Sequence, residues 1–195
     1  MREPIMLLVP GILATQEDFA PGKGIQRLVP SIVAMGYQAW PIYPGFFGLL
    51  RVRLAGGPVA HILASFVREL SYRTHAVSGV GHSHGAPFRT LTFINGAVDK
   101  DVKIGSEVGR VLNYYVRSDK VLGLANLLPF NPMGNAGKLG IDLGKTARVI
   151  NGNLFSICGA KGHDDYADWS KLGRFARAWA VDLQTAAGLG EKGTE

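Results

Sequence analysis

The stretch S-G-V-G-H-S-H-G-A-P-F contains a serine, Ser83, whose surroundings could make it a nucleophile. Gly81 and Gly85 complete a G-x-S-x-G pattern, and His82 and His84 flank the serine. Glycines lack a Cβ, so they allow the sharp turn that exposes a nucleophilic hydroxyl. The alternative is a small-residue loop that matches by chance, because the chain contains 26 glycines. The pattern becomes specific only where it joins a strand to a helix.

The sequence on either side of Ser83 predicts such a junction. H-A-V-S-G-V-G, before the serine, is typical of a strand. A-P-F-R-T-L-T-F-I-N-G, after it, is interpreted as a helix with Pro87 in its first turn, where a missing N–H costs little. The first N–H groups of that helix would favour negative charge developing on a bound acyl group.

A base and an orienting acid are expected to follow the nucleophile, in the order Ser, Asp or Glu, His. Asp119 directly follows the predicted strand V-L-N-Y-Y-V-R-S, and His163 follows the predicted strand N-G-N-L-F-S-I-C-G-A. Functional groups gather beyond the carboxyl ends of the strands in an open α/β sheet. We therefore expect Asp119 and His163 at the edge that carries Ser83. The alternatives are a turn aspartate bonded to its own backbone and a surface-loop histidine.

The other four histidines fit the role of the base less well. His61 falls inside a predicted helix, and His75 precedes a strand and so lies at the opposite edge. His82 and His84 adjoin the serine in a sharp turn, where neighbouring side chains diverge. A base must reach the serine Oγ within about 3 Å, which favours His163.

Two backbone N–H groups are predicted to form an oxyanion hole. His84 follows the nucleophile and would supply one of them. Ile12, after the turn at Gly11, would supply the other, although a simple strand-ending Pro-Gly turn is the alternative. His82 and His84 have no accompanying His, Cys or Asp at zinc-type spacing, so no metal site is expected.

Strand-like and helix-like segments alternate along the chain, which predicts an α/β fold with a mainly parallel sheet of about five to six strands and helices on both faces. The whole chain, residues 1–195, is predicted to be a single domain. Residues 120–150 are interpreted as a loop or short helical flap. The remaining strands are expected within residues 4–11 and 37–44, and the remaining helices within 22–36, from Pro58 to about residue 70, and within 168–184.

Composition agrees with a globular protein, since 47% of the 195 residues are hydrophobic and 18% are charged. The formal charge of +6 is spread along the chain without a nucleic-acid motif, so no nucleic-acid partner is expected. The lone cysteine, Cys158, is expected to be buried in a strand. The N-terminal apolar run is too short for a signal peptide, and no segment is long enough to span a bilayer; we therefore expect a cytoplasmic protein.

These motifs together resemble the α/β-hydrolase superfamily, and the size is similar to that of small lidless bacterial lipases and esterases. The resemblance rests on V-P-G-I-L, G-H-S-H-G, R-S-D-K-V and G-H-D-D-Y and extends over about residues 4–183. It implies a minimal fold without a large cap domain and a carboxylic ester hydrolase that needs no cofactor. Ser83 would be the nucleophile, His163 the base and then the acid, and Asp119 its orienting partner. Pro10 departs from the family, in which a histidine often precedes the glycine of the oxyanion loop.

Apolar loops at the same edge suggest a lipid-like ester as the substrate. Phe46 and Phe47 come from one loop, and Leu122 and Leu124 from another, but all four could equally be core residues. Transient contact with a membrane surface is compatible with such a substrate. The alternatives are a thioesterase or amidase with the same triad, and a non-catalytic hydrolase-like binding module. The oligomeric state is left open by the sequence.

Overall fold

The computed structural model describes most of the strands and helices that the sequence predicts, together with the turns next to them. The described residues are 4–9, 16–17, 20–42, 62, 65, 66, 68, 69, 77–80, 89–96, 108–125, 136–142 and 149–188. They form two compact units. The first unit comprises Met1–Leu91 with Ile104–Val108, and the second comprises Thr92–Lys103 with Gly109–Glu195.

The first unit is built on three parallel strands. β1 (Ile5–Leu8) pairs on one side with β2 (Gln38–Pro41) and on the other with β3 (Val77–Val80). All of β1 is buried, as a continuous apolar run covered on both faces should be. The strand predictions for residues 4–11, 37–44 and 75–81 are confirmed in these segments.

The helix predicted within residues 22–36 begins as an α-helix only at Val29, so that Pro30 falls in its first turn, where a missing N–H costs little. A 3₁₀ helix (Gly24–Leu28) leads into α1 (Val29–Ala34), and Pro30 occupies the first turn of α1. Gly36, with φ of 81°, follows the helix in the left-handed conformation that ends many helices.

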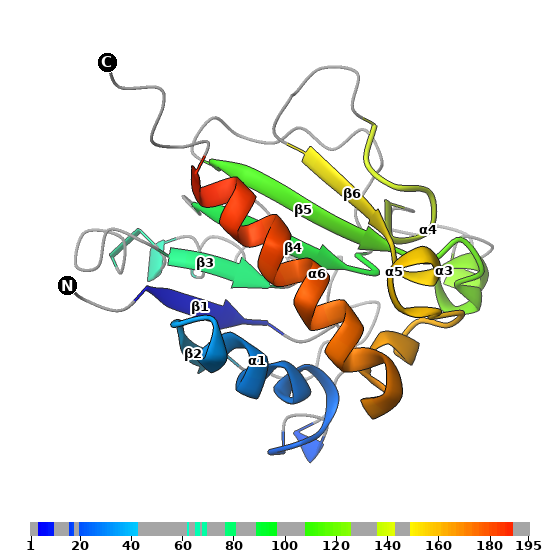
Figure 1. The fold of residues 1–195 in the computed structure, drawn as a ribbon, viewed down its shortest axis with the longest axis horizontal. Helices are drawn as coiled ribbons and strands as arrows, with labels where there is room; N and C mark the ends of the chain where they lie inside the picture. Colours follow the sequence, from blue (N-terminus) through cyan, green and yellow to red (C-terminus); the bar gives the residue numbers. More distant parts are fainter. Residues whose placement is uncertain are drawn as a thin grey trace. The chain divides into compact units, whose positions relative to one another are not determined.

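In its described residues, the second unit contains a parallel pair of strands, four α-helices and the short 3₁₀ helix Asp165–Ala167. β5 (Arg110–Tyr115) and β6 (Val149–Asn153) are parallel, with Val111 opposite Val149 and Tyr115 opposite Asn153. Figure 1 shows the short helices of this unit beyond the C-terminal ends of β5 and β6. These helices are α3 (Lys120–Ala125), α4 (Ala136–Leu139) and α5 (Leu154–Cys158). α3 and α4 agree with the prediction of a loop or short helical flap within residues 120–150.

The long C-terminal helix α6 (Trp169–Gly188) supplies the core of the second unit and lies across β5 in Figure 1. Its buried side chains are Leu172, Phe175, Trp179, Leu183 and Ala186. Phe175 meets Tyr114 of β5 edge to face, with ring centroids 5.1 Å apart. The predicted amphipathic helix is thus confirmed, except that Trp169 is 69% exposed, because the first residue of the helix precedes the turns that pack.

Two predicted elements are wrong. The helix expected over residues 86–96 is in fact β4 (Thr90–Ile94) in its second half. Four of the five residues of T-L-T-F-I are β-branched or aromatic, and all five are buried, as in a strand covered on both faces. The turn expected at Ser83 and the first half of the predicted helix lie outside the described residues.

The strand expected over residues 151–160 is also misplaced. The strand β6 ends at Asn153, so only the first three residues of this segment are in a strand, and the helix α5 follows directly. The Asn153 side chain accepts a hydrogen bond from the Phe155 N–H and so caps the helix, which ends at Gly159 with φ of 77°. The hydrophobic pattern of this apolar run fits a strand and a buried helix equally well. The helix is favoured because Asn153 caps its start and Gly159 allows its end.

The structure confirms a mixed α/β fold with parallel strands. The described pairings within the units join three parallel strands in the first unit and two in the second, and β4 continues beside β5, because the Asn95 N–H donates to the Tyr114 carbonyl. Apolar runs indicate where strands occur but not which strands are hydrogen-bonded neighbours. No helix in the described part of the chain is long and apolar enough to cross a membrane.

Candidate functional site

The structure describes two of the residues predicted to do chemistry, Asp119 and His163, and brings them together. Both belong to the second unit. The other predicted site residues lie outside the described residues: Ser83, Ile12, His84, Phe46 and Phe47.

Asp119 follows β5 at the start of α3 and is buried, with its side chain 0% exposed. Its own N–H donates to the Val116 carbonyl over 3.1 Å, which closes the turn after the strand. One carboxylate oxygen, Oδ1, accepts a hydrogen bond from the Leu122 N–H over 3.0 Å. This is the N-cap bond that satisfies a free donor in the first turn of a helix. The helix start thereby fixes the orientation of the carboxylate.

The second oxygen of Asp119 is hydrogen-bonded to His163. The distance between His163 Nδ1 and Asp119 Oδ2 is 2.7 Å. A carboxylate can only accept, so Nδ1 carries the proton in the neutral imidazole and Nε2 has the free lone pair. Among the residues that the structure describes, none is hydrogen-bonded to Nε2. The imidazole is partly open, with 24% of the side chain exposed, so Nε2 is suited to accept a proton from another group.

The surroundings of His163 raise the pKa of its imidazole above the ordinary value. Burial is the largest single influence and acts in the other direction, because it disfavours the charged ring. The hydrogen bond and the negative charge of Asp119 outweigh burial, and the charge of Asp164 adds to them. A histidine with a raised pKa is a stronger base than a free imidazole.

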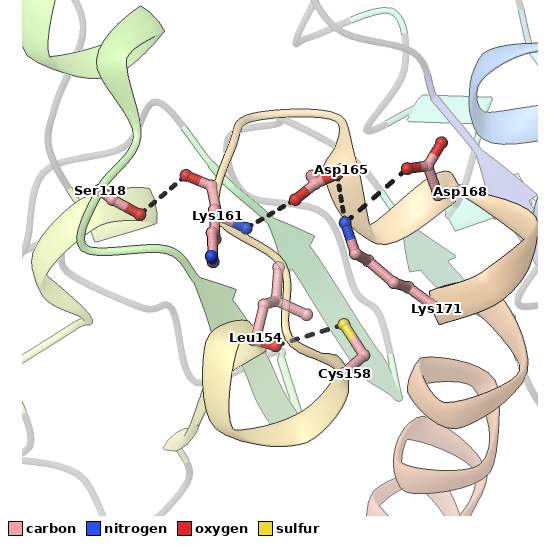
Figure 2. A network of polar contacts seen from close by, with 7 residues as sticks. All are labelled: Ser118, Leu154, Cys158, Lys161, Asp165, Asp168 and Lys171. Atoms are coloured by element: carbon pink, nitrogen blue, oxygen red, sulfur yellow. Dashed lines mark hydrogen bonds and ion pairs between the residues drawn. The ribbon is translucent and has the colours of Figure 1, made fainter.

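The loop that carries His163 is tied to its neighbours on both sides of the histidine. Figure 2 shows that the Ser118 hydroxyl donates to the Lys161 carbonyl over 2.7 Å, and that the Lys161 N–H donates to Asp165 Oδ2 over 2.7 Å. Lys171 of α6 binds the other oxygen of Asp165 at 2.5 Å. Ser118 is the neighbour of Asp119, so the turn that holds the acid also holds the loop that holds the base.

Asn95 is a residue of this site that the sequence analysis missed. It follows β4 and is 1% exposed, and its side-chain Nδ2 donates a hydrogen bond to the His163 carbonyl. Its φ of 48° is the one positive value among the described non-glycine residues. The dipeptide Asn95-Gly96 after a β-branched run is a turn signal that could have located this strand end.

The predicted substrate-binding residues of the second loop differ in exposure. Leu122 is 2% exposed and belongs to the core, whereas Leu124 is 65% exposed. Both lie on α3, directly after Asp119, so of these two leucines only Leu124 presents apolar surface beside the Asp119–His163 pair.

The described residues contain no cluster of three or more histidine, cysteine or acidic side chains that could hold a metal ion. Cys158 is buried, as expected, but in a helix, and burial raises the pKa of its thiol. It is therefore unlike the electropositive, partly open cysteines that act as nucleophiles.

No family model, curated protein or solved structure matches this chain.

Proposed function

We propose that this protein is a serine hydrolase of the α/β-hydrolase type that cleaves carboxylic esters. The proposed triad consists of Ser83 as nucleophile, His163 as general base and acid, and Asp119 as the carboxylate that orients the histidine. No metal or organic cofactor takes part in the proposed reaction.

One observation carries the proposal: the buried carboxylate of Asp119, at the end of β5, binds Nδ1 of the partly open His163 on the loop that follows β6 and α5. The His163 side chain is 24% exposed, and Nε2 has no hydrogen-bond partner among the described residues, as a general base requires. The carboxylate is held by the start of α3 and the histidine by its loop, so both groups are positioned before any substrate binds. Such preorganisation is characteristic of catalytic pairs.

The mechanism follows from these roles. His163 Nε2 takes the Ser83 hydroxyl proton as Oγ attacks the ester carbonyl, and the imidazolium is stabilised by Asp119. His163 then gives the proton to the leaving alcohol, and an acyl-enzyme remains on Ser83. Water, deprotonated by the same histidine, attacks the acyl carbon; the bond to Ser83 Oγ then breaks, His163 returns the proton to Oγ, and the acid is released. The backbone N–H groups of Ile12 and His84 are proposed to bind the oxyanion in both halves of the reaction.

The proposal makes a geometric demand on the part of the chain around Ser83. Its Oγ must come within hydrogen-bond reach of His163 Nε2, about 3 Å. The strand β3 that precedes Ser83 supports this demand, because G-x-S-x-G must follow a strand. The replacement of the expected helix by β4 counts against an ordinary nucleophile elbow, so labelling of the serine is the decisive test.

The test combines hydrolysis with covalent labelling. The purified protein is expected to hydrolyse a short p-nitrophenyl ester, and Ser83→Ala to abolish hydrolysis. A fluorophosphonate probe is expected to label Ser83, as located by peptide mass spectrometry, and to lose the label in His163→Ala. Ser156→Ala, at an exposed serine of α5, is the matched control and should retain both properties.

Each outcome bears on a different part of the proposal. Unchanged hydrolysis in Ser83→Ala would refute the assignment of the nucleophile. Labelling that persists in His163→Ala would refute the role of the base. Parallel kinetics with matched thioester and amide substrates determine which acyl bond is preferred, and the proposal expects the highest kcat/KM for the oxygen ester.

A further inference from the structure

We infer that Asn95 is a positioning residue for His163: its side-chain amide holds the main chain of the histidine so that the imidazole lies against Asp119. This inference deepens the proposed function, on which it rests for its catalytic meaning. Asn95 touches no reacting atom in this scheme and acts only through His163.

The position of the hydrogen bond from the Asn95 side chain supports a positioning role. Asn95 Nδ2 donates to the carbonyl of His163 itself, while Ser118 holds the loop two residues earlier, at Lys161. With Nδ1 on Asp119, the histidine is thus fixed at its ring and at its main chain from two different strand ends. A ring that is held only at Nδ1 could still pivot about that bond.

The backbone conformation of Asn95 also supports a positioning role. Its φ of 48° is in the left-handed region, where asparagine and glycine are the residues most readily accepted. Its N–H continues the strand pairing by donating to the Tyr114 carbonyl over 2.8 Å. The strand therefore continues to Asn95 and then turns, which directs the amide to the His163 loop instead of along the sheet.

The oxygen of the Asn95 side-chain amide has no hydrogen-bond partner among the described residues. Asn95 Oδ1 is buried and accepts no hydrogen bond from any residue that the structure describes. An orphaned acceptor opposes folding. A side chain kept only for stability would be better replaced by glycine at this φ, so the Nδ2 bond to His163 is the feature that accounts for an asparagine here.

The backbone at Asn95 and Gly96 is itself held in place by α4. Gly137 of α4 lies against the backbone of residues 95 and 96, and its N–H donates to the Gly96 carbonyl over 2.8 Å. Its carbonyl accepts a hydrogen bond from the Val116 N–H over 3.0 Å, just before the turn that contains Asp119. The backbone under Asn95 and the backbone under Asp119 are thus joined through one residue, so the amide acts from a fixed base.

The experiment uses Asn95→Gly, because glycine accepts the positive φ while removing the amide. The readout is the imidazole of His163 in the substrate-free protein, followed by ¹⁵N and ¹H NMR over pH. We expect the Hδ1 resonance, visible in the wild type, to broaden through exchange with water, and the pKa of His163 to fall toward its ordinary value. With an ester substrate, we expect kcat to fall about 10- to 100-fold while KM changes little.

Asn113→Ala is the matched control. Asn113 is also a buried asparagine with an unsatisfied Oδ1, but its amide donates to Ala136 and Asn151 and not to the His163 loop. We expect it to lower the thermal unfolding midpoint without moving the His163 resonances. If Asn95→Gly folds and leaves the Hδ1 signal and the pKa of His163 as in the wild type, the inference is wrong.

A second measurement needs no variant. A scalar coupling across the hydrogen bond, from Asn95 Nδ2 to the carbonyl carbon of His163, is expected in the wild type, with slow exchange of the Nδ2 protons. Absence of both would overturn the inference even if Asn95→Gly does not fold. A wild type that hydrolyses no ester but whose His163 signals respond to Asn95→Gly would refute the hydrolase and support the positioning role, so the two failures are distinguishable.

Discussion

Two carboxylates bind basic side chains around the same loop, yet they differ in two properties that determine function, burial and partner. Asp119 binds His163 at 2.7 Å with its side chain 0% exposed, and Asp165 binds Lys171 at 2.5 Å with its side chain 25% exposed. Both also accept a backbone N–H with their second oxygen, from Leu122 and Lys161 respectively. The two arrangements are chemically alike and differ in burial and in the partner.

This difference separates a functional pair from a structural one. A lysine has no lone pair to offer while it is protonated, and the hydrogen bond from Lys171 lowers the pKa of the Asp165 carboxyl, so both groups stay charged near neutrality. Histidine changes its charge near neutrality, and a buried carboxylate has a strong influence on when it does so. The Asp119–His163 pair, whose carboxylate is buried, can therefore move a proton, whereas the half-buried Asp165–Lys171 pair can only hold the loop.

The largest effect is expected from Asp119→Asn. The asparagine keeps the shape and can keep the cap on Leu122 through its oxygen, but its NH₂ cannot accept from His163 Nδ1–H. The imidazole then takes the wrong tautomer, a change that costs about 10⁴-fold in kcat in serine hydrolases of known mechanism. Ester hydrolysis by the purified variant measures the loss. Retention of more than about a tenth of the activity would show that the buried pair is not functionally different from the Asp165–Lys171 pair.

The second prediction concerns the pH dependence of the buried pair. His163 must be neutral to act as a base, and its pKa is raised above 6.5, so kcat/KM should increase with pH through a midpoint above 6.5. Below that midpoint the rate should fall about tenfold per pH unit. Protonated His163 also stabilises the folded protein below pH 6.5, and this contribution is lost as the pH rises through the raised pKa.

Asp119→Asn provides the check on this assignment. It removes the hydrogen bond and the charge that raise the pKa of His163, while burial remains. NMR titration of the imidazole should therefore give a lower pKa in Asp119→Asn than in the wild type. An unchanged pKa would mean that another group controls the histidine.

The third prediction tests the support under the buried pair through Gly137. A Cβ on this residue would overlap the carbonyl carbon of Asn95 and would lie 2.6 Å from the Gly96 nitrogen, both of them backbone atoms that cannot move alone. We expect Gly137→Ala to destabilise the protein by about 1–3 kcal/mol in chemical denaturation, as overpacking does. The control is Gly173→Ala on α6, where a Cβ meets nothing within 4 Å. There alanine should stabilise the helix by about 0.5–1 kcal/mol.

The sequence predicted the buried pair by placing each member after a strand. Asp119 does follow β5. The apolar run before His163 is mostly α5, but the parallel strand β6 precedes it, so the prediction holds although that segment was assigned to the wrong element. From the sequence, a turn aspartate and a triad aspartate are alternatives for Asp119. The structure shows that one side chain does both, since Oδ1 caps α3 and Oδ2 binds His163.

The errors have a common physical origin. Residues 86–96 and 151–160 are apolar stretches of about the same length, and hydrophobic pattern alone does not distinguish a buried strand from a short buried helix. Local polar residues decide such cases, as Asn153 does by capping α5. Asn95 was missed because its role depends on a hydrogen bond to a residue 68 positions away, which no local pattern encodes.

The smallest effect is expected at the half-buried Asp165–Lys171 pair. Asp165→Asn keeps an oxygen for the Lys161 N–H and loses only the charge that attracts Lys171, an interaction that water and salt already weaken. We expect kcat within about twofold of the wild type and an unfolding midpoint that moves less than in Gly137→Ala. Asp165→Ala, which also loses the bond to the Lys161 N–H, should have the larger effect of the two. If thermal unfolding and ester hydrolysis show Asp165→Asn to be as damaging as Asp119→Asn, burial is not what distinguishes the two carboxylates, and the charge on the loop becomes the better explanation for both.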